Sequence, residues 1–409
     1  MSLGRLARRL LAPVRRLQMG WRGDAAAARH RPVAGGPPPG PGAGGTVVLD
    51  IRDRPLDRDH YLLGRTLFAG GFSVHLRVRS EAMGRADGYG RELLGLPGLT
   101  VETTRRGRPA DPPPTDPAQT VWVSEDPSTD VPERPWRAVM RLDYDWYSAP
   151  PGGLTALFTM HPVQYRPAVP GREGTRPIDD LTGLRATERT AGVLFAGAVD
   201  PALYAAGGPI TERYGLLPRA TILARLDAGP HAPLRLPPPP NDGPTAAGDD
   251  GPTAAGRAGG GAFRAALARF GGDARRRFVR TDGWRIDAED WLPTLAQADF
   301  FLTAPGFKIP HAHNVVEALA VGAVPIINYA HLMRPPLTDR EALLFRTEDE
   351  LTERVGEALA MPPEERRRMA RAAAAYYDAH LTPEAFAKTF LRAADAAGPD
   401  PITLYLNAE

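Results

Sequence analysis

The sequence contains no cysteine, which excludes disulfide bonds, thiolate metal sites, iron–sulfur clusters and a cysteine nucleophile. It also has no apolar run of about 18 residues or more, the length that a membrane-spanning helix needs. Lysine is scarce, because Lys308 and Lys388 are the two lysines among 50 basic residues. From these absences we expect a cytoplasmic protein with no membrane-spanning helix.

Glycine and proline are abundant by contrast, with 43 and 44 among 409 residues. The excess is clustered in residues 32–45, 105–118 and 228–261, and the rest reads as ordinary globular sequence. A chain of this length exceeds what one hydrophobic core usually organises, so two domains of about 150 to 200 residues are expected. The hydrophobic share of 43% and the charged share of 24% exclude a wholly disordered chain.

The net charge of +2 is unevenly distributed. Residues 1–23 carry six arginines and no acidic residue, so the rest of the chain is mildly acidic and gives no reason to expect a nucleic-acid partner. Apolar residues recur every three or four positions in this segment, which is typical of an amphipathic helix on an anionic membrane surface. We therefore expect peripheral attachment at the inner face of the membrane. Pro13 would break such a helix, so a disordered basic leader is the alternative.

The order of predicted elements is that of parallel strand–helix–strand units. Runs of β-branched and aromatic residues predict strands at 46–51, 72–78, 120–124, 138–144, 191–198, 276–280, 299–303 and 324–327. Helical patterns fall at 57–68, 219–226, 262–270, 288–298, 351–361 and 363–381, and Thr382-Pro383-Glu384 predicts the start of a last helix. The fold class is therefore α/β, with two Rossmann-like domains.

The composition also suggests the domain boundaries. We expect a basic leader and Gly/Pro linker at 1–45, a first domain at 46–185, a second domain at 186–395 and a tail at 396–409. Residues 228–261 contain four consecutive prolines and two copies of DGPTAAG, a composition that buries too little apolar area to offset the entropy of ordering. We expect a disordered insertion there.

The segment from Asp299 to Ile327 is the strongest candidate for a ligand site. A strand ends at Thr303, a loop containing Gly306 and Lys308 follows, and the next helix starts near Pro310. The start of a helix at the carboxyl edge of a parallel sheet presents free N–H groups and a positive dipole end, which suits a phosphate. A solvated loop with no ligand is the alternative interpretation.

Glu317 lies four residues after His313, so both side chains share one face of the predicted helix. A carboxylate one turn inside a phosphate-binding helix is placed to accept two hydrogen bonds from a vicinal diol such as a ribose. The positive charges of Lys308, His311 and His313 precede it without an intervening acid.

The run from His313 to Ile327, HNVVEALAVGAVPII, resembles the donor-site element of GT-B glycosyltransferases, in which a Glu-Ala pair is followed by Gly and by Val/Ile-Pro before a buried strand. The resemblance covers most of residues 186–395 and implies two Rossmann-like domains with a cleft between them. It also implies that Glu317 binds the donor ribose, with Gly197, Gly306, Lys308, His313 and Asn314 around the nucleotide sugar.

One position departs from part of this family. Retaining enzymes of the family-4 type carry a second glutamate eight positions before the ribose-binding one, and here that position is Ile309. The exostosin-like pattern has a basic residue four positions before, which His313 matches. The resemblance therefore favours the exostosin-like group, while retention or inversion at the anomeric carbon stays open.

The acceptor side offers several candidate bases. His161 follows an apolar stretch and precedes a proline, so we name it as the candidate base, with Asp53, Asp143 and Asp145 as further candidates. Asp143-Tyr144-Asp145 also matches the Asp-x-Asp pattern by which other glycosyltransferases hold a divalent cation. If the chain is a GT-B enzyme, the helix dipole and basic side chains offset the charge of the diphosphate. We therefore expect no metal and no cofactor.

We expect an enzyme that transfers a sugar from a nucleotide-sugar donor to a hydroxyl of a glycan, lipid or small molecule. A non-catalytic sugar-nucleotide or glycan-binding protein on the same scaffold is the alternative from another class. A sugar epimerase on that scaffold is a third hypothesis.

Overall fold

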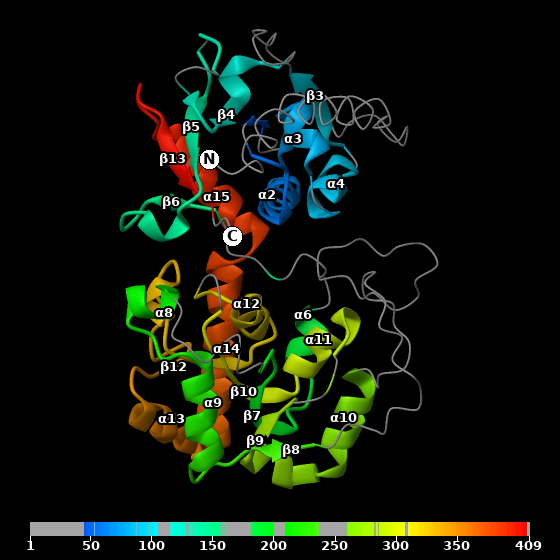
Figure 1. Cartoon of the computed structure of the whole chain (residues 1–409), viewed down its shortest axis with the longest axis vertical. Coiled ribbons are helices and arrows are strands. Elements are labelled where there is room, and N and C mark those ends of the chain that lie inside the picture. Colours follow the sequence, from blue (N-terminus) through cyan, green and yellow to red (C-terminus); the bar gives the residue numbers. More distant parts are fainter. Residues whose placement is uncertain are drawn as a thin grey trace, which may run out of the picture. The chain divides into compact units, whose positions relative to one another are not determined.

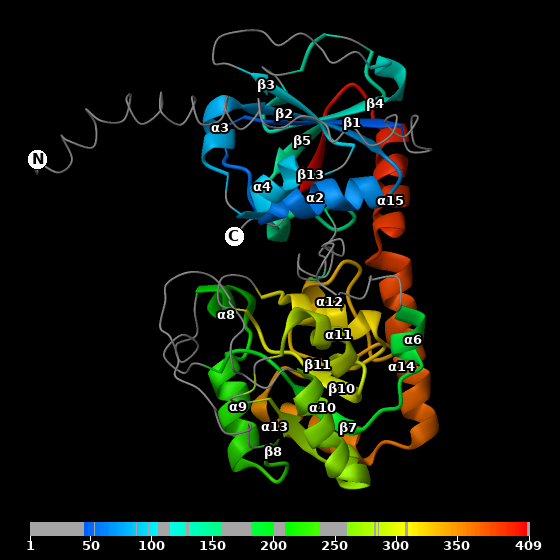
Figure 2. The same ribbon diagram turned by 90° about the vertical axis from the view of Figure 1, so that its right-hand side faces the viewer.

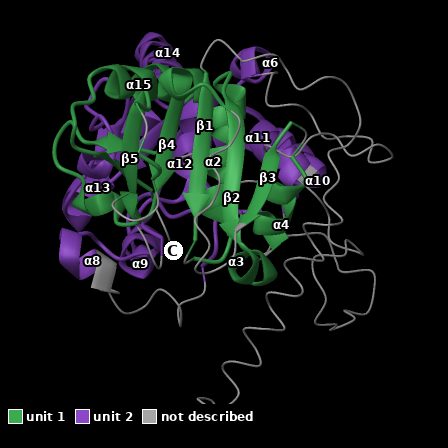
Figure 3. Ribbon diagram, turned by 90° about the horizontal axis from the view of Figure 1, so that it is seen from above, with its two compact units in different colours: residues 1–158, 382–408 green, residues 159–381, 409 purple. Residues whose placement is uncertain are grey.

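The computed structural model of the chain describes residues 45–52, 54–86, 88–96, 98–104, 115–127, 131–133, 135–156, 160, 181–199, 209–236, 260–281, 284, 286–306 and 310–406 (Figure 1). The chain divides into two compact units (Figure 3). The first comprises residues 1–158 and 382–408, and the second comprises residues 159–381 and 409.

The first unit is built on a seven-stranded parallel sheet. Its strand order is β3 (Thr100–Thr104), β2 (Ser73–Arg79), β1 (Thr46–Ile51), β4 (Thr120–Ser124), β5 (Ala138–Asp143), β13 (Ile402–Tyr405) and β6 (Leu154–Thr155). The central strands β1 and β4 are buried along nearly their whole length, which explains their near-continuous β-branched sequences.

Within the described residues, this sheet is accompanied by the helices α2 (Arg58–Ala69), α3 (Ser80–Gly84), α4 (Gly88–Leu94) and α15 (Pro383–Asp395). Helix α2 begins where the Asp57 side chain accepts hydrogen bonds from the backbone N–H groups of the first turn. It ends at Gly70, where a Cβ atom would lie 2.8 Å from the Cβ of Ala387 on α15. A glycine at this position therefore permits the close packing of α2 on α15.

The second unit is built on a six-stranded parallel sheet. Its order is β12 (Leu343–Leu344), β11 (Val324–Ile327), β10 (Ala298–Leu302), β7 (Ala191–Phe195), β9 (Phe278–Arg280) and β8 (Leu234–Arg235). Alternate residues such as Val193, Phe300 and Val324 form one core with α9 (Arg219–Ala228) and α13 (Glu348–Ala360). Because strand side chains alternate between faces, the residues between them point to the other layer of helices.

That other layer contains α11 (Ala288–Leu295), α12 (His313–Ala320) and α14 (Pro363–His380), which contact β10 and β11 (Figure 2). Helix α12 ends at Gly322, whose φ of +72° lies in the left-handed region that favours glycine. Other helices in the described part of this unit are α6 (Leu181–Arg185), α8 (Pro209–Tyr214) and α10 (Gly260–Arg269). Short 3-10 turns lie at η1 (Pro117–Gln119) and η2 (Trp146–Ser148) in the first unit and at η5 (Gly271–Arg276) and η6 (Ala330–Leu332) in the second.

These two parallel sheets with their helices confirm the α/β class and the two Rossmann-like units predicted from the sequence. None of the helices within the described ranges is long and apolar enough to cross a membrane. The leader at 1–44 lies outside the described residues.

The structure differs from the expected boundaries at two places. Helix α15 and the expected tail belong to the first unit, because β13 inserts between β5 and β6 of its sheet. The segment expected to be a disordered insertion begins too early, since β8 pairs with β9 and the Leu236 carbonyl accepts a hydrogen bond from Trp284 Nε1 at 2.8 Å. Residues 237–259, which contain the two repeats, lie outside the described residues.

Candidate functional site

The candidate site is the carboxyl edge of the second unit's sheet, where β7, β10 and β11 end. Parallel strands bring the loops that follow them to one edge, and ligands of α/β sheets bind there. Arg219, the first residue of α9, joins two of these loops. Its guanidinium donates to the Ala198 carbonyl after β7 at 3.1 Å and to the Ala304 carbonyl after β10 at 3.3 Å.

Two buried rings lie beneath this edge. The rings of His311 and Tyr329 are 5.7 Å apart, edge to face. Burial, together with the charges of Arg334 and His331, lowers the pKa of His311 to about 3, so this imidazole is neutral at physiological pH. Burial raises the pKa of Tyr329 to about 12 against the opposing effects of Thr303 and Arg219. Both side chains are therefore uncharged.

Helix α12 starts at this edge. Ala312 is its N-cap residue, with φ −106° and ψ 144°. The alanine side chain makes no capping hydrogen bond to the first turn. Gly306 N–H donates to the Pro310 carbonyl at 3.1 Å and closes the loop before the helix. A helix start of this kind offers backbone N–H groups and a positive dipole end to an anion.

Glu317 is buried, with 2% of its surface exposed. Its Oε2 accepts a hydrogen bond of 2.5 Å from Nε1 of Trp291 on α11. This bond holds the carboxylate of Glu317 against α11.

The structure brings several of the predicted donor residues to this edge. Gly197 is exposed after β7, and Gly306 is half-buried after β10, its neighbour in the sheet. His313 and Asn314 are half-buried in the first turn of α12. Lys308 lies outside the described residues.

Of the four candidate bases on the acceptor side, the structure describes two. His161 and Asp53 lie outside the described residues. Asp143 is the last residue of β5, and Asp145 follows two residues later. The Asp145 N–H donates a hydrogen bond to Asp143 Oδ1 at 2.9 Å, which closes a turn. In the part of the chain that the structure describes, no three histidine or acidic side chains are grouped as a metal ion requires.

Three residues of the site escaped the sequence analysis: Arg219, Trp291 and Tyr329. A signal existed for Arg219, because it shares a helix stripe with the buried residues Ile222, Leu223 and Leu226. A charge on a buried stripe needs polar partners, and the two loop carbonyls supply them. The contacts of Trp291 and Tyr329 depend on elements distant in sequence and had no local signal.

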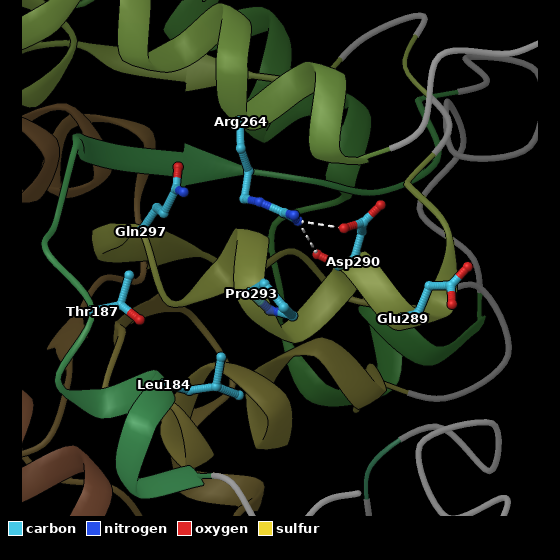
Figure 4. Close-up of a pocket in the computed structure, with 7 residues that line it drawn as sticks. All are labelled: Leu184, Thr187, Arg264, Glu289, Asp290, Pro293 and Gln297. Atoms are coloured by element: carbon cyan, nitrogen blue, oxygen red, sulfur yellow. Dashed lines mark hydrogen bonds and ion pairs between the residues drawn. The ribbon is translucent and has the colours of Figure 1, made fainter. Parts of the chain in front are cut away.

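A polar pocket of about 380 Å³ lies elsewhere in the second unit. Its lining comprises Leu184, Thr187, Arg264, Glu289, Asp290, Pro293 and Gln297 (Figure 4). Arg264 reaches from α10 to α11, and its ion pair with Asp290 measures 2.6 Å. None of the predicted donor residues lines this pocket.

Comparison with known proteins supports a role in sugar transfer. Residues 263–392, which include α12 and β11, match the family model described as glycosyl transferase-like. No curated protein matches the chain. Over these residues the match agrees with the predicted resemblance to glycosyltransferases.

Several solved structures are distantly similar. Anabaena HepE in complex with UDP and glucose is 11% identical, covers 86% of this chain and 100% of its own, and has a TM-score of 0.42. Thermobaculum terrenum O-GlcNAc transferase is 15% identical over 91% and 72%, with a TM-score of 0.38. AviGT4, a glycosyltransferase involved in avilamycin A biosynthesis, is 16% identical over 86% and 97%, with a TM-score of 0.36.

Proposed function

We propose that this chain transfers a sugar from a nucleoside-diphosphate sugar to a hydroxyl acceptor, with the donor bound at the carboxyl edge of the second sheet. The observation that carries the proposal is the junction of β10, the Gly306 loop and α12, which lies inside the segment matching the glycosyl transferase-like model. A diphosphate at the start of α12 meets backbone N–H groups and the positive end of the helix.

The remaining site residues fit this arrangement. In this proposal Lys308 and His313 contact the diphosphate, and Glu317, oriented by Trp291, accepts hydrogen bonds from the ribose diol. Arg219 holds the loops of Gly197 and Gly306 in place through its two carbonyl contacts. Since helix and side chains offset the charge of the leaving diphosphate, transfer proceeds without a divalent metal.

The test is the affinity of the full chain for UDP, GDP, ADP, CDP and dTDP, measured by calorimetry. We expect one of them to bind, and we expect Glu317→Gln to weaken that binding roughly 10- to 100-fold, because hydrogen bonds to a charged group contribute about 1.5–3 kcal/mol. Glu357→Gln is the matched control, since that carboxylate pairs with Arg354 on the surface of α13. Unchanged affinity in Glu317→Gln would remove the ribose contact.

We propose further that residues 1–23 hold the enzyme on an anionic membrane surface, where a lipid-linked or glycan acceptor is assembled. Six arginines and a stripe of leucines in this segment support the proposal. The intact chain should float with vesicles containing phosphatidylserine, and a version lacking residues 2–23 should not. Equal flotation of both proteins would exclude this role.

A further inference from the structure

Four hydrogen-bonded side chains lie at the carboxyl edge of the first unit's sheet. Asp57 and His60 stand at the start of α2, Glu125 follows β4, and Tyr144 follows β5. His60 Nδ1 lies 2.7 Å from Asp57 Oδ1, and His60 Nε2 lies 3.0 Å from the Tyr144 hydroxyl. That hydroxyl donates to Glu125 Oε1 at 2.7 Å. We call these four residues the relay.

The hydrogen bonds of the relay run in one direction, toward Glu125. His60 Nδ1 lies close to Asp57 Oδ1 and accepts a hydrogen bond from the Asp57 N–H at 3.4 Å, so Nε2 carries the proton that is donated to the Tyr144 oxygen. The Tyr144 hydroxyl gives its own proton to Glu125. This tautomer is assigned from hydrogen-bond geometry.

Glu125 is the member of the relay best placed to receive a proton from outside. It is half-buried, whereas the side chain of His60 is fully buried. Its other oxygen is anchored by the Arg52 N–H at 2.8 Å. Burial and the charge of Glu125 raise the pKa of Tyr144, so that hydroxyl stays protonated and serves as a donor. The Arg54 guanidinium lies 3.8 Å above the Tyr144 ring and holds it.

We propose that Glu125 is the catalytic base of sugar transfer, with Tyr144, His60 and Asp57 as positioning residues that hold it in place. The location supports this role, because the relay joins the carboxyl ends of β4 and β5 to the start of α2, at the edge where α/β sheets bind ligands. The inference rests on the proposed function and adds the group that activates the acceptor.

The reaction step follows from the chemistry of a base. The acceptor oxygen forms a bond to the anomeric carbon while its proton passes to Glu125. The bond from that carbon to the diphosphate breaks, and the nucleoside diphosphate leaves with the electron pair. A base on the acceptor serves a single direct displacement, so the anomeric configuration inverts.

The first test uses water as the acceptor and the nucleotide sugar that the full chain hydrolyses. Early ¹H NMR spectra, taken before mutarotation, should show release of the inverted anomer. Glu125→Gln should lower the hydrolysis rate by roughly 10²- to 10⁴-fold, the usual contribution of a general base. Its affinity for the nucleoside diphosphate should stay unchanged.

Glu102→Gln is the matched control. This half-buried carboxylate on β3 accepts hydrogen bonds from Arg77 and His75 in the same sheet and lies outside the relay. We expect its hydrolysis rate to stay within about threefold of the wild type, which is below the contribution of a base. Release of the retained anomer, or wild-type turnover in Glu125→Gln, would overturn the assignment.

Tyr144→Phe provides a second readout if Glu125→Gln does not fold. Phenylalanine removes the hydroxyl that donates to ionised Glu125, so the acid limb of the kcat/KM profile should move to higher pH. A purely structural role of the hydroxyl would change the rate without moving the limb. An unmoved limb in Tyr144→Phe would contradict the relay.

Failure of this inference is distinguishable from failure of the proposed function. If no nucleoside diphosphate binds and no nucleotide sugar is hydrolysed, the proposed function is wrong. If the wild type hydrolyses a nucleotide sugar at a rate that Glu125→Gln matches, the base assignment alone is wrong.

Discussion

At the scale of single residues, His311 shows how the second unit uses burial to control charge. The imidazole is 2% exposed and packs against the Tyr329 ring just before α12. Its lowered pKa, about 3 against an ordinary 6.5, keeps it neutral while His313 stands half-buried in the helix that follows. The positive charge near the proposed diphosphate therefore comes from the helix and from other side chains, and His311 serves packing.

This burial predicts a pH-dependent stability. Since the folded pKa of His311 lies below the unfolded one, its contribution is complete above about pH 6.5 and is lost as the pH falls toward 3. Between pH 7 and pH 5 the wild type should lose about 2 kcal/mol more of unfolding free energy than His311→Asn. Denaturant titrations at the two pH values measure this difference. Equal losses in both proteins would show that His311 is accessible to protons when folded.

The residue scale also separates what the sequence could predict from what it could not. The pattern around Glu317 identified the helix and its position after a strand, because both depend on local spacing. The partner of Glu317 is Trp291, which comes from a preceding helix, and no local pattern encodes that contact. In the Asp143-Tyr144-Asp145 run, the structure places the tyrosine in the relay, whereas the flanking carboxylates form a turn.

At the scale of elements, β13 is the feature with the largest consequence. This short strand, Ile402–Tyr405, pairs with β5 on one side and with β6 on the other. Leu404 is fully buried in the sheet. The end of the chain therefore completes the first unit's sheet, although more than two hundred residues of the second unit intervene in the sequence.

Removal of residues 398–409 should destabilise the first unit. The deletion takes away the strand between β5 and β6 and exposes the apolar surface that Leu404 and Leu406 cover. We expect a loss of roughly 3–5 kcal/mol, the range for removing two large buried side chains. Limited proteolysis and thermal melting of the truncated chain measure the effect.

The matched control is a deletion of residues 242–256, which contain both DGPTAAG repeats. Because this composition buries little apolar area, its removal should leave the melting temperature unchanged. If the repeat deletion destabilises the chain as much as loss of β13, the prediction that this segment buries little apolar area is wrong.

Local sequence patterns were sufficient for the long elements of the fold. Strands β1, β4 and β11 match the predicted ranges because each is a buried run of β-branched residues. Helix α15 starts at the predicted cap, where Thr382 Oγ1 accepts from the Ala385 N–H at 3.2 Å. Strands of two residues such as β6, β8 and β12 carry no periodicity, and their existence depends on a neighbouring strand.

At the scale of the whole molecule, each unit has a parallel sheet whose carboxyl edge gathers polar side chains. In the second unit this edge holds the start of α12 and the arginine-linked loops. In the first unit it holds the relay of Asp57, His60, Tyr144 and Glu125. We propose that the first of these edges binds the donor and that the second carries the base.

Turnover of a nucleotide sugar by the full chain is the measurement that tests this account most directly. The chain is incubated with UDP-, GDP-, ADP- and dTDP-glucose, and released nucleoside diphosphate and free sugar are followed by chromatography. The account predicts that one donor is consumed, with release of its diphosphate at a rate that falls in Glu317→Gln. Tight binding of a nucleotide sugar without any release would contradict the account and indicate a sugar-nucleotide-binding protein. Isomerisation of the sugar while it stays attached to the nucleotide would contradict it as well and indicate an epimerase.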